Sequence, residues 1–209
     1  MEVEAKFMVP SAVVLEELAA LSAVGECRVL SRREVDQEDA YWDTPAGSLA
    51  TLGASLRVRT LDGRATFTAK LPRQQSDGAW VRQEIEAPAE GRELPAWVES
   101  LRQAGSFPEG VRTETLRPVL RVRNRRTQVD LATPGGARLE MAADRAEFLG
   151  VSRTGGDWEL ELELAEAPGG AAAALVELEQ AAAWLRDRFG LIPSRKSKYQ
   201  RALAALETE

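Results

Sequence analysis

Apolar and charged residues alternate along several short stretches of the chain, and this period of two predicts β-strands. The first stretch is 2–7, where Glu2, Glu4 and Lys6 share one face while Val3, Ala5 and Phe7 share the other. The same alternation recurs in residues 56–60, 65–71, 81–86, 119–125 and 158–164. Asp62-Gly63 and Asp77-Gly78 are typical of hairpin turns between such strands. The pattern therefore predicts an antiparallel sheet that carries its charges on one face.

Helical spacing of apolar residues appears between these strands. Ser11 is a suitable N-cap for a first helix that ends near Gly25. Further helices are predicted at 95–103, at 170–189 with Gly190 as the stop, and from 193 through Leu206. Additional short strands are predicted at 27–35, 37–42, 127–131, 137–143 and 145–151. No linker is long enough to divide the chain, so we expect one α+β domain over residues 1–209.

The charges on these strands are sorted by sign. Arginines repeat on some strands, as in Arg57/Arg59 and Arg121/Arg123/Arg125, whereas acids repeat on others, as in Glu2/Glu4 and Glu159/Glu161/Glu163. An ordinary sheet with its polar face in water is the alternative interpretation. The sorting by sign and the amphipathic helices, which can cover the apolar face, favour a charged face turned inward.

An inward acidic strand needs cations. Carboxylates two residues apart on one strand face lie about 6.6 Å apart and repel by about 0.6 kcal/mol in water, but by about 2.5 kcal/mol at an effective dielectric near 20. A divalent ion among these acids would relieve the repulsion, and oxygen ligands suit Mg²⁺ or Mn²⁺. The basic residues need an anion, and a metal-bridged polyphosphate satisfies both sets. The basic set consists of Lys6, Arg57, Arg59, Lys70, Arg82, Arg121, Arg123 and Arg125.

Composition narrows the function classes further. The formal net charge is −6, which disfavours nucleic-acid binding through a basic surface. The chain contains no His, so sites that use histidine as a metal ligand or general base are excluded. No stretch is apolar enough to span a membrane or to form a signal peptide, so a cytoplasmic location is expected. The sequence leaves open whether the protein is a monomer or a homodimer.

The charged motifs resemble, in order, those of the CYTH domain family, also called the triphosphate tunnel metalloenzymes. The resemblance spans nearly the whole chain and begins with Glu2-x-Glu4-x-Lys6. Its further motifs are Tyr41-Trp42-Asp43-Thr44, Leu56-Arg57-Val58-Arg59, Thr68-Ala69-Lys70, Arg82-x-Glu84-x-Glu86, Arg121-x-Arg123, Glu140 to Asp144, Glu159/Glu161/Glu163 and Ser197-Lys198-Tyr199. Each motif alone is common, but nine in the same order make a chance match improbable.

The resemblance implies a closed antiparallel barrel of eight strands, with a charged tunnel inside and helices outside. It also implies Mg²⁺- or Mn²⁺-dependent action on a small-molecule triphosphate. The implied metal ligands are Glu2, Glu4, Asp144, Glu159, Glu161 and Glu163. The implied substrate-binding residues are Lys6, Arg57, Arg59, Lys70, Arg82, Arg121, Arg123 and Lys198. Glu4, Lys70 and Tyr41 are implied to be catalytic.

Several alternatives stay open at this point. Glu84 and Glu86 either bind metal or, as we expect, pair with neighbouring arginines, and Arg125 either binds phosphate or lies in solvent. We expect hydrolysis of inorganic tripolyphosphate. The alternatives are a CyaB-type adenylate cyclase, a thiamine triphosphatase, or a non-catalytic binder of polyphosphate or nucleotide.

Overall fold

One large antiparallel sheet organises the fold, in a computed structural model that describes residues 3–72, 74–76, 79–81 and 83–207. The strands follow the order β12-β1-β11-β10-β9-β3-β4-β5-β8, and β2 pairs with β3 beside this path. The ten strands are β1 (Glu4–Met8), β2 (Ala23–Val24), β3 (Cys27–Asp43), β4 (Ser55–Leu61), β5 (Arg64–Lys70), β8 (Glu84–Pro88), β9 (Arg117–Ala132), β10 (Arg138–Leu149), β11 (Thr154–Glu166) and β12 (Ile192–Pro193). A separate hairpin is formed by β6 (Gln74–Ser76) and β7 (Ala79–Val81).

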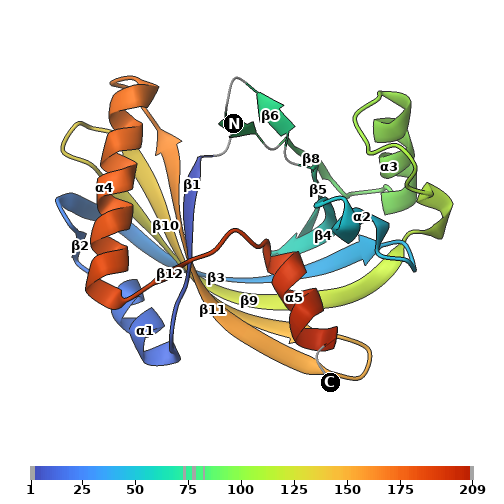
Figure 1. Ribbon diagram of the computed structural model, residues 1–209, viewed down its shortest axis with the longest axis horizontal. Coiled ribbons are helices and arrows are strands. Elements are labelled where there is room, and N and C mark those ends of the chain that lie inside the picture. The colour runs from blue at the N-terminus through green and yellow to red at the C-terminus, as the bar shows by residue number, and fades with distance from the viewer. Residues whose placement is uncertain (1–2, 73, 77–78, 82, 208–209) are drawn as a thin grey trace.

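The sheet is strongly curved (Figure 1), and within the part of the chain that the structure describes no hydrogen bonds close it into a barrel. Among the described residues, β12 and β8 are the two ends of the pairing order. The expectation of a closed eight-stranded barrel is therefore wrong in both strand number and closure. Strand number differs partly because three pairs of predicted short strands merge into β3, β9 and β10. These strands continue through the polar residues Asp36, Arg126 and Asp144, where the prediction placed a break.

The four predicted helices are present as α1 (Ala12–Ala20), α3 (Leu94–Gln103), α4 (Ala171–Phe189) and α5 (Lys198–Glu207). The bounds of α3 and α4 agree with the prediction to within one residue, whereas α1 ends about five residues before Gly25 and α5 begins five residues after position 193. The structure adds the short helix α2 (Ser48–Thr51) and the 3₁₀ turn η1 (Thr113–Thr115), which were not predicted. The hydroxyl of Ser11 accepts a hydrogen bond from the Val14 amide, which confirms the predicted N-cap. Gly190 ends α4 with a left-handed φ of 63°, a conformation that glycine adopts without steric cost.

Two groups of helices cover the apolar outer face of the sheet. Leu18 of α1 and Leu185 of α4 pack with Leu160 and Leu162 of β11 in one core cluster. On the other flank, α2 and α3 pack on β4 and β5 in a second cluster, which contains Leu49, Trp97, Val98, Leu56 and Phe67. Figure 1 shows these two groups on opposite sides of the molecule. The charged residues of the same strands are thereby left on the inner face.

Helix α5 is the exception, because it packs on the inner face. Its Tyr199 and Ala202 lie against Val122 of β9 and Phe148 of β10. Consequently the N-terminal half of β9 buries its even-numbered residues, such as Val122, against α5. The C-terminal half buries odd-numbered residues, such as Val129, against the helices of the outer face. This change of buried face within one strand determines where the arginines of β9 point.

Candidate functional site

Strand pairing aligns the charged residues of the inner face in rows. On adjacent strands, Glu4 pairs with Glu163, Lys6 with Glu161, and Asp144 with Glu159. Directly paired residues on neighbouring strands point to the same face of a sheet. The predicted acidic and basic motifs of the two chain ends therefore meet on one surface.

This surface lines a cavity of about 920 Å³ between the two halves of the curved sheet. Its described lining includes six basic and five acidic side chains. The basic ones are Lys6, Arg57, Arg59, Lys70, Arg126 and Lys198, and the acidic ones are Glu4, Glu84, Glu86, Glu161 and Glu163. Tyr41 also lines the cavity. The structure thus brings together most of the site residues predicted from the sequence.

The acidic wall of the cavity is formed by β1 and β11. The ammonium of Lys6 lies 3.1 Å from Glu4 Oε1 and 3.0 Å from Glu161 Oε1. Burial raises the pKa of Glu161, but Lys198, Lys6 and Arg126 outweigh this effect and hold that pKa well below its usual value. Burial lowers the pKa of Lys6, but the nearby carboxylates of Glu161, Glu159 and Glu4 outweigh burial and raise this pKa above its usual value. Both groups are therefore charged at neutral pH.

The basic wall is formed by β4 and β5 and is held by a carboxylate that the sequence analysis missed. Asp39 of β3 is 1% exposed and accepts from Arg59 Nε and Nη2, both at 2.8 Å, and from Arg57 Nη1 at 3.3 Å. Burial raises the pKa of Asp39, but the two arginines lower it below its usual value. The alternation Asp39, Tyr41, Asp43 along β3 was the signal that could have placed Asp39 on the inner face.

Glu84 pairs with neighbouring basic residues, as expected. Its carboxylate lies 2.8 Å from Lys70 Nζ and 3.8 Å from Arg57 Nη2. Glu86 instead accepts a hydrogen bond from the Thr68 hydroxyl at 2.9 Å. These contacts orient the basic wall toward the cavity.

Arg126 of β9 is the basic residue that the sequence analysis did not select. It donates to both oxygens of Asp144, at 2.8 and 2.7 Å, and to Glu161 at 2.7 Å. The C-terminal half of β9 contains its signal, because Arg126 and Gln128 alternate there with the buried Val129. The sequence analysis instead followed the N-terminal half of β9, where the arginines occupy odd-numbered positions and therefore lie on the other face of the strand.

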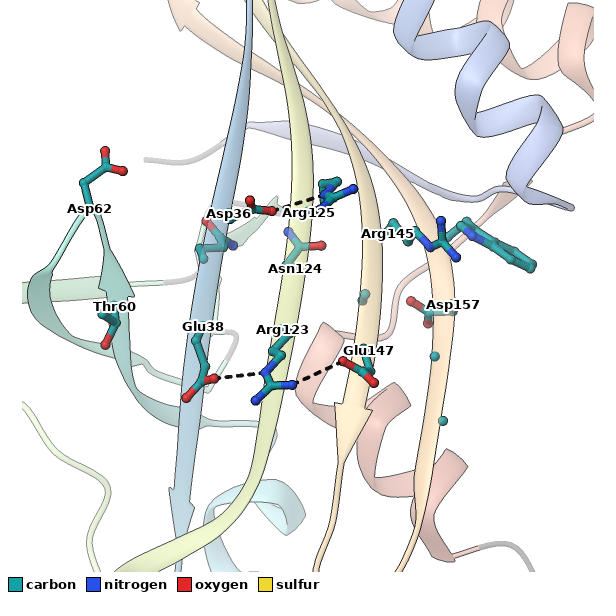
Figure 2. A pocket seen from close by; sticks show the side chains of 15 residues that line it. Asp36, Glu38, Thr60, Asp62, Arg123, Asn124, Arg125, Arg145, Glu147 and Asp157 are labelled. Atoms are coloured by element: carbon teal, nitrogen blue, oxygen red, sulfur yellow. Dashed lines mark hydrogen bonds and ion pairs between the residues drawn. The ribbon is translucent and has the colours of Figure 1, made fainter.

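Arg121 and Arg123 lie on the opposite face of the sheet from the cavity. Their side chains are 61% and 63% exposed, compared with 12% for Arg57, and both pair with Glu38. Figure 2 shows Arg123 between Glu38 and Glu147 in a second pocket, beside the ion pair of Arg125 with Asp36. The prediction had placed Arg121 and Arg123 with the other substrate-binding residues, but the structure does not bring them to this cavity, because the residues that face inward beside them, Leu120 and Val122, pack against α5. Arg125 lies in solvent, as one alternative expected.

Asp144 and Glu159 are fully buried behind the cavity wall and contact basic side chains. Lys198 Nζ is 2.7 Å from Asp144 Oδ2 and 2.9 Å from Glu159 Oε2, and Arg201 Nη1 is 2.7 Å from Glu159 Oε1. Asp144, Glu159 and Glu161 each offer one oxygen within 4.8 Å of the others, a spacing that suits a metal ion. The donor set of the whole wall consists of carboxylates, which fits a hard divalent cation.

Tyr41 lies between the cavity and α5. Its ring stacks on that of Tyr199, with centroids 4.9 Å apart and planes at 8°, and the Tyr199 hydroxyl donates to Asp43 at 2.9 Å. One face of Tyr41 is therefore covered by protein. Lys70, its predicted catalytic partner, lines the same cavity.

The remaining predicted residues, Glu2 and Arg82, lie outside the residues that the structure describes.

The sequence of the chain matches the CYTH domain family over residues 1–186. The chain belongs to the CYTH family. No curated protein sequence matches this CYTH protein. Among the described helices, none has the length and apolar character needed to cross a bilayer.

Solved structures share the fold of this CYTH protein across nearly its whole length. HpAC1 of Hippeastrum, a proposed adenylyl cyclase described with a dominant triphosphatase activity, is 21% identical with a TM-score of 0.61, and the match covers 98% of this chain and 96% of that one. A proposed adenylate cyclase of Bacillus halodurans is 18% identical with a TM-score of 0.57, over 96% of each chain. The PH1819 protein of Pyrococcus horikoshii is 18% identical with a TM-score of 0.55, over 97% and 99% of the two chains. At these identities the likeness establishes the fold.

Proposed function

We propose that this CYTH protein hydrolyses a triphosphate with the help of a divalent metal, and that its substrate is inorganic tripolyphosphate. The observation that carries the proposal is the division of one cavity into an acidic wall on β1 and β11 and a basic wall on β4 and β5. A metal-bound chain of phosphates presents both the cation and the anion that such walls bind.

The charge balance of the cavity supports a metal requirement. Among the described residues, the five acidic lining residues are backed by three buried carboxylates, those of Asp39, Asp144 and Glu159. Together these eight acids face seven basic residues, the six that line the cavity and the buried Arg201 that contacts Glu159. The basic residues described above already contact carboxylates, so a bare triphosphate would bring several more negative charges into a site without excess positive charge. Divalent cations that enter with the substrate correct this imbalance.

Each wall has a distinct role in the proposal. Arg57, Arg59 and Lys70 hold phosphate oxygens on one side, and Arg126 and Lys198 neutralise charge from the inner end. On the acidic side, Glu4, Glu161 and Glu163 hold the metal. A bound Mg²⁺ or Mn²⁺ supplies charge neutralisation at the phosphates and a water of lowered pKa.

The lining of the cavity favours an inorganic substrate. Tyr41 is the one aromatic side chain among the described lining residues, and Tyr199 already covers one of its faces. A nucleoside or a thiamine group is generally bound by apolar and aromatic surface. Leu164 and Ala165 are the apolar residues in the described lining, and together they offer little such surface.

A product assay tests the proposal. The purified protein is offered tripolyphosphate, ATP and thiamine triphosphate with Mg²⁺ or Mn²⁺, and released phosphate, pyrophosphate and cyclic AMP are measured. We expect phosphate and pyrophosphate from tripolyphosphate, and loss of turnover in Glu4→Gln. Cyclic AMP from ATP would instead indicate a cyclase, preferential cleavage of thiamine triphosphate would indicate a thiamine triphosphatase, and binding without any turnover would refute the enzymatic proposal.

A further inference from the structure

Two stacked tyrosines join helix α5 to the basic wall of the cavity. Tyr199, on α5, is 1% exposed, and its ring stacks on that of Tyr41 with centroids 4.9 Å apart. Tyr41, on β3, pairs directly with Arg57 on β4, so these two side chains lie side by side on the inner face. Tyr41 and Arg57 line the cavity, whereas Tyr199 is not among the described residues of its lining. Tyr199 therefore reaches the cavity only through Tyr41.

The buried carboxylate of Asp43 holds Tyr199 at its hydroxyl end. Asp43 is 0% exposed and accepts three backbone hydrogen bonds of 2.7, 2.8 and 3.0 Å, from the amides of Thr44, Leu49 and Ala50. The Tyr199 hydroxyl donates to the same carboxylate at 2.9 Å. Burial raises the pKa of Tyr199 and Asp43 raises it further, so the hydroxyl stays protonated and continues to donate. The stacked ring is thus fixed from both sides, by a hydrogen-bonded turn and by Tyr41.

Few contacts fix the orientation of Arg57. Its Nη1 donates to Asp39 at 3.3 Å and its Nη2 lies 3.8 Å from Glu84, and both distances are longer than the usual N–H···O hydrogen bond. Among the described residues, its buried Nε has no hydrogen-bond partner. Burial lowers the pKa of Arg57, but Asp39, Tyr41 and Glu84 outweigh burial and raise this pKa, in part through a hydrogen bond with Tyr41. The Tyr41 side chain therefore supports a guanidinium that its other contacts hold loosely.

We propose that Tyr199 is a positioning residue for Arg57 and that it acts through Tyr41. Without the Tyr199 ring, the covered face of Tyr41 borders a void, and the Tyr41 hydroxyl can move away from the guanidinium. Arg57 then keeps only its two long contacts and is less well oriented to bind phosphate. This inference rests on the proposed triphosphate-binding function. It makes Tyr41 a support for Arg57 in place of a group that takes part in phosphoryl transfer.

The first test removes the ring of Tyr199 and leaves the cavity lining unchanged. Steady-state kinetics with tripolyphosphate and Mg²⁺ or Mn²⁺ are measured for Tyr199→Leu and Tyr199→Phe. Arg57 contacts phosphate in the bound substrate and in the transition state alike, so we expect Tyr199→Leu to raise KM at least fivefold while kcat stays within twofold of wild type. Tyr199→Phe keeps the stacked ring, so its KM should rise less than twofold. Unchanged KM in Tyr199→Leu, or an equal rise in both variants, overturns the proposal.

Phe148→Leu is the matched control for loss of core packing. Phe148, on β10, belongs to the same core cluster as Tyr199 and is also 1% exposed. Within the described part of the chain, its ring does not stack on Tyr41. Phe148→Leu should therefore lower the melting temperature about as much as Tyr199→Leu but leave KM within twofold of wild type. Equal increases of KM in the two variants would mean that lost packing alone explains the effect, which contradicts the proposal.

The second test asks whether Tyr199 acts through Tyr41. Tyr41→Phe keeps the stack but removes the hydroxyl beside Arg57, so KM should rise about as much as in Tyr199→Leu. The double variant should have a KM within twofold of either single variant, because both changes interrupt the same chain of contacts. Multiplied effects in the double variant refute the coupling. A tenfold loss of kcat with unchanged KM in Tyr41→Phe also refutes it, and this comparison decides the matter if Tyr199→Leu does not fold.

A measurement without substrate separates this proposal from the proposed function. Exchange of the Arg57 Nε proton with water is followed by NMR in the wild type, in Tyr199→Leu and in Phe148→Leu. We expect exchange at least tenfold faster in Tyr199→Leu than in the other two proteins. A protein that passes this test but hydrolyses no triphosphate retains the positioning of Arg57 and loses the proposed function. A protein that hydrolyses tripolyphosphate but shows equal exchange in all three forms retains the function and refutes the positioning role.

Discussion

Asp39→Asn tests whether one buried carboxylate holds the basic wall of the cavity together. Asparagine has nearly the same shape but lacks the charge that Arg57 and Arg59 share through three contacts of 2.8 to 3.3 Å. The two arginines are two residues apart on one strand face, so without Asp39 they repel by about 2.5 kcal/mol at an effective dielectric near 20.

The expected loss of stability follows from the burial of this group. Breaking a buried ion pair by removal of one partner costs about 3–5 kcal/mol. For a chain of this length, each kcal/mol lowers the melting temperature by about 2–4 °C, so we expect a decrease of about 6–20 °C. Tripolyphosphate should stabilise the variant more than the wild type, because its oxygens replace the lost carboxylate between the arginines.

Glu38→Gln is the matched control for this measurement. Glu38 is the preceding residue on β3 and also contacts two arginines, at 3.2 and 3.3 Å, but on the outer face, where those arginines are more than 60% exposed. Exposed pairs contribute about 0–1 kcal/mol, so its melting temperature should decrease by less than about 4 °C. Thermal unfolding followed by circular dichroism, with and without tripolyphosphate, measures both variants. Equal decreases in the two variants, or no extra stabilisation of Asp39→Asn by the anion, would refute the reasoning.

Three further predictions follow from the site. Arg126→Met should lower kcat/KM for tripolyphosphate at least tenfold, whereas Arg123→Met on the outer face should change it less than twofold; the reverse order in a steady-state assay would contradict the assignment of faces. Burial raises the pKa of Asp144, but Lys198 and Arg126 outweigh burial and lower this pKa below its usual value of 3.8. The unfolded chain therefore binds more protons than the folded one just below pH 4, so the stability of the protein should decline there. Urea unfolding between pH 6 and pH 3 should show a shallower decline in Asp144→Asn than in the wild type, and parallel curves would disprove this contribution. Tyr199→Phe leaves the buried Asp43 without one donor and should destabilise the protein by about 1–3 kcal/mol, which the urea midpoint at pH 7 measures.

The sequence by itself determined which strands carry charge and which sign each carries. Strict alternation places Glu4 and Lys6, or Arg57 and Arg59, on one face wherever the strand lies, because side chains of a strand alternate with a period of two. The helices were predictable for a similar reason. The spacing of their apolar residues and their end signals, such as Ser11 and Gly190, depend only on residues that are close in the sequence. The order of these motifs was enough to indicate the CYTH family.

Only the tertiary structure decided which face of β9 points into the cavity. Its odd-numbered arginines looked equivalent to Arg57 and Arg59, yet α5 packs against the even-numbered residues at that end, so Arg121 and Arg123 point outward and Arg126 reaches the site. Alternation specifies two faces but not which of them a distant helix will cover. The open edge between β8 and β12 was undetermined for the same reason, because closure depends on curvature and on pairing between segments far apart in the chain.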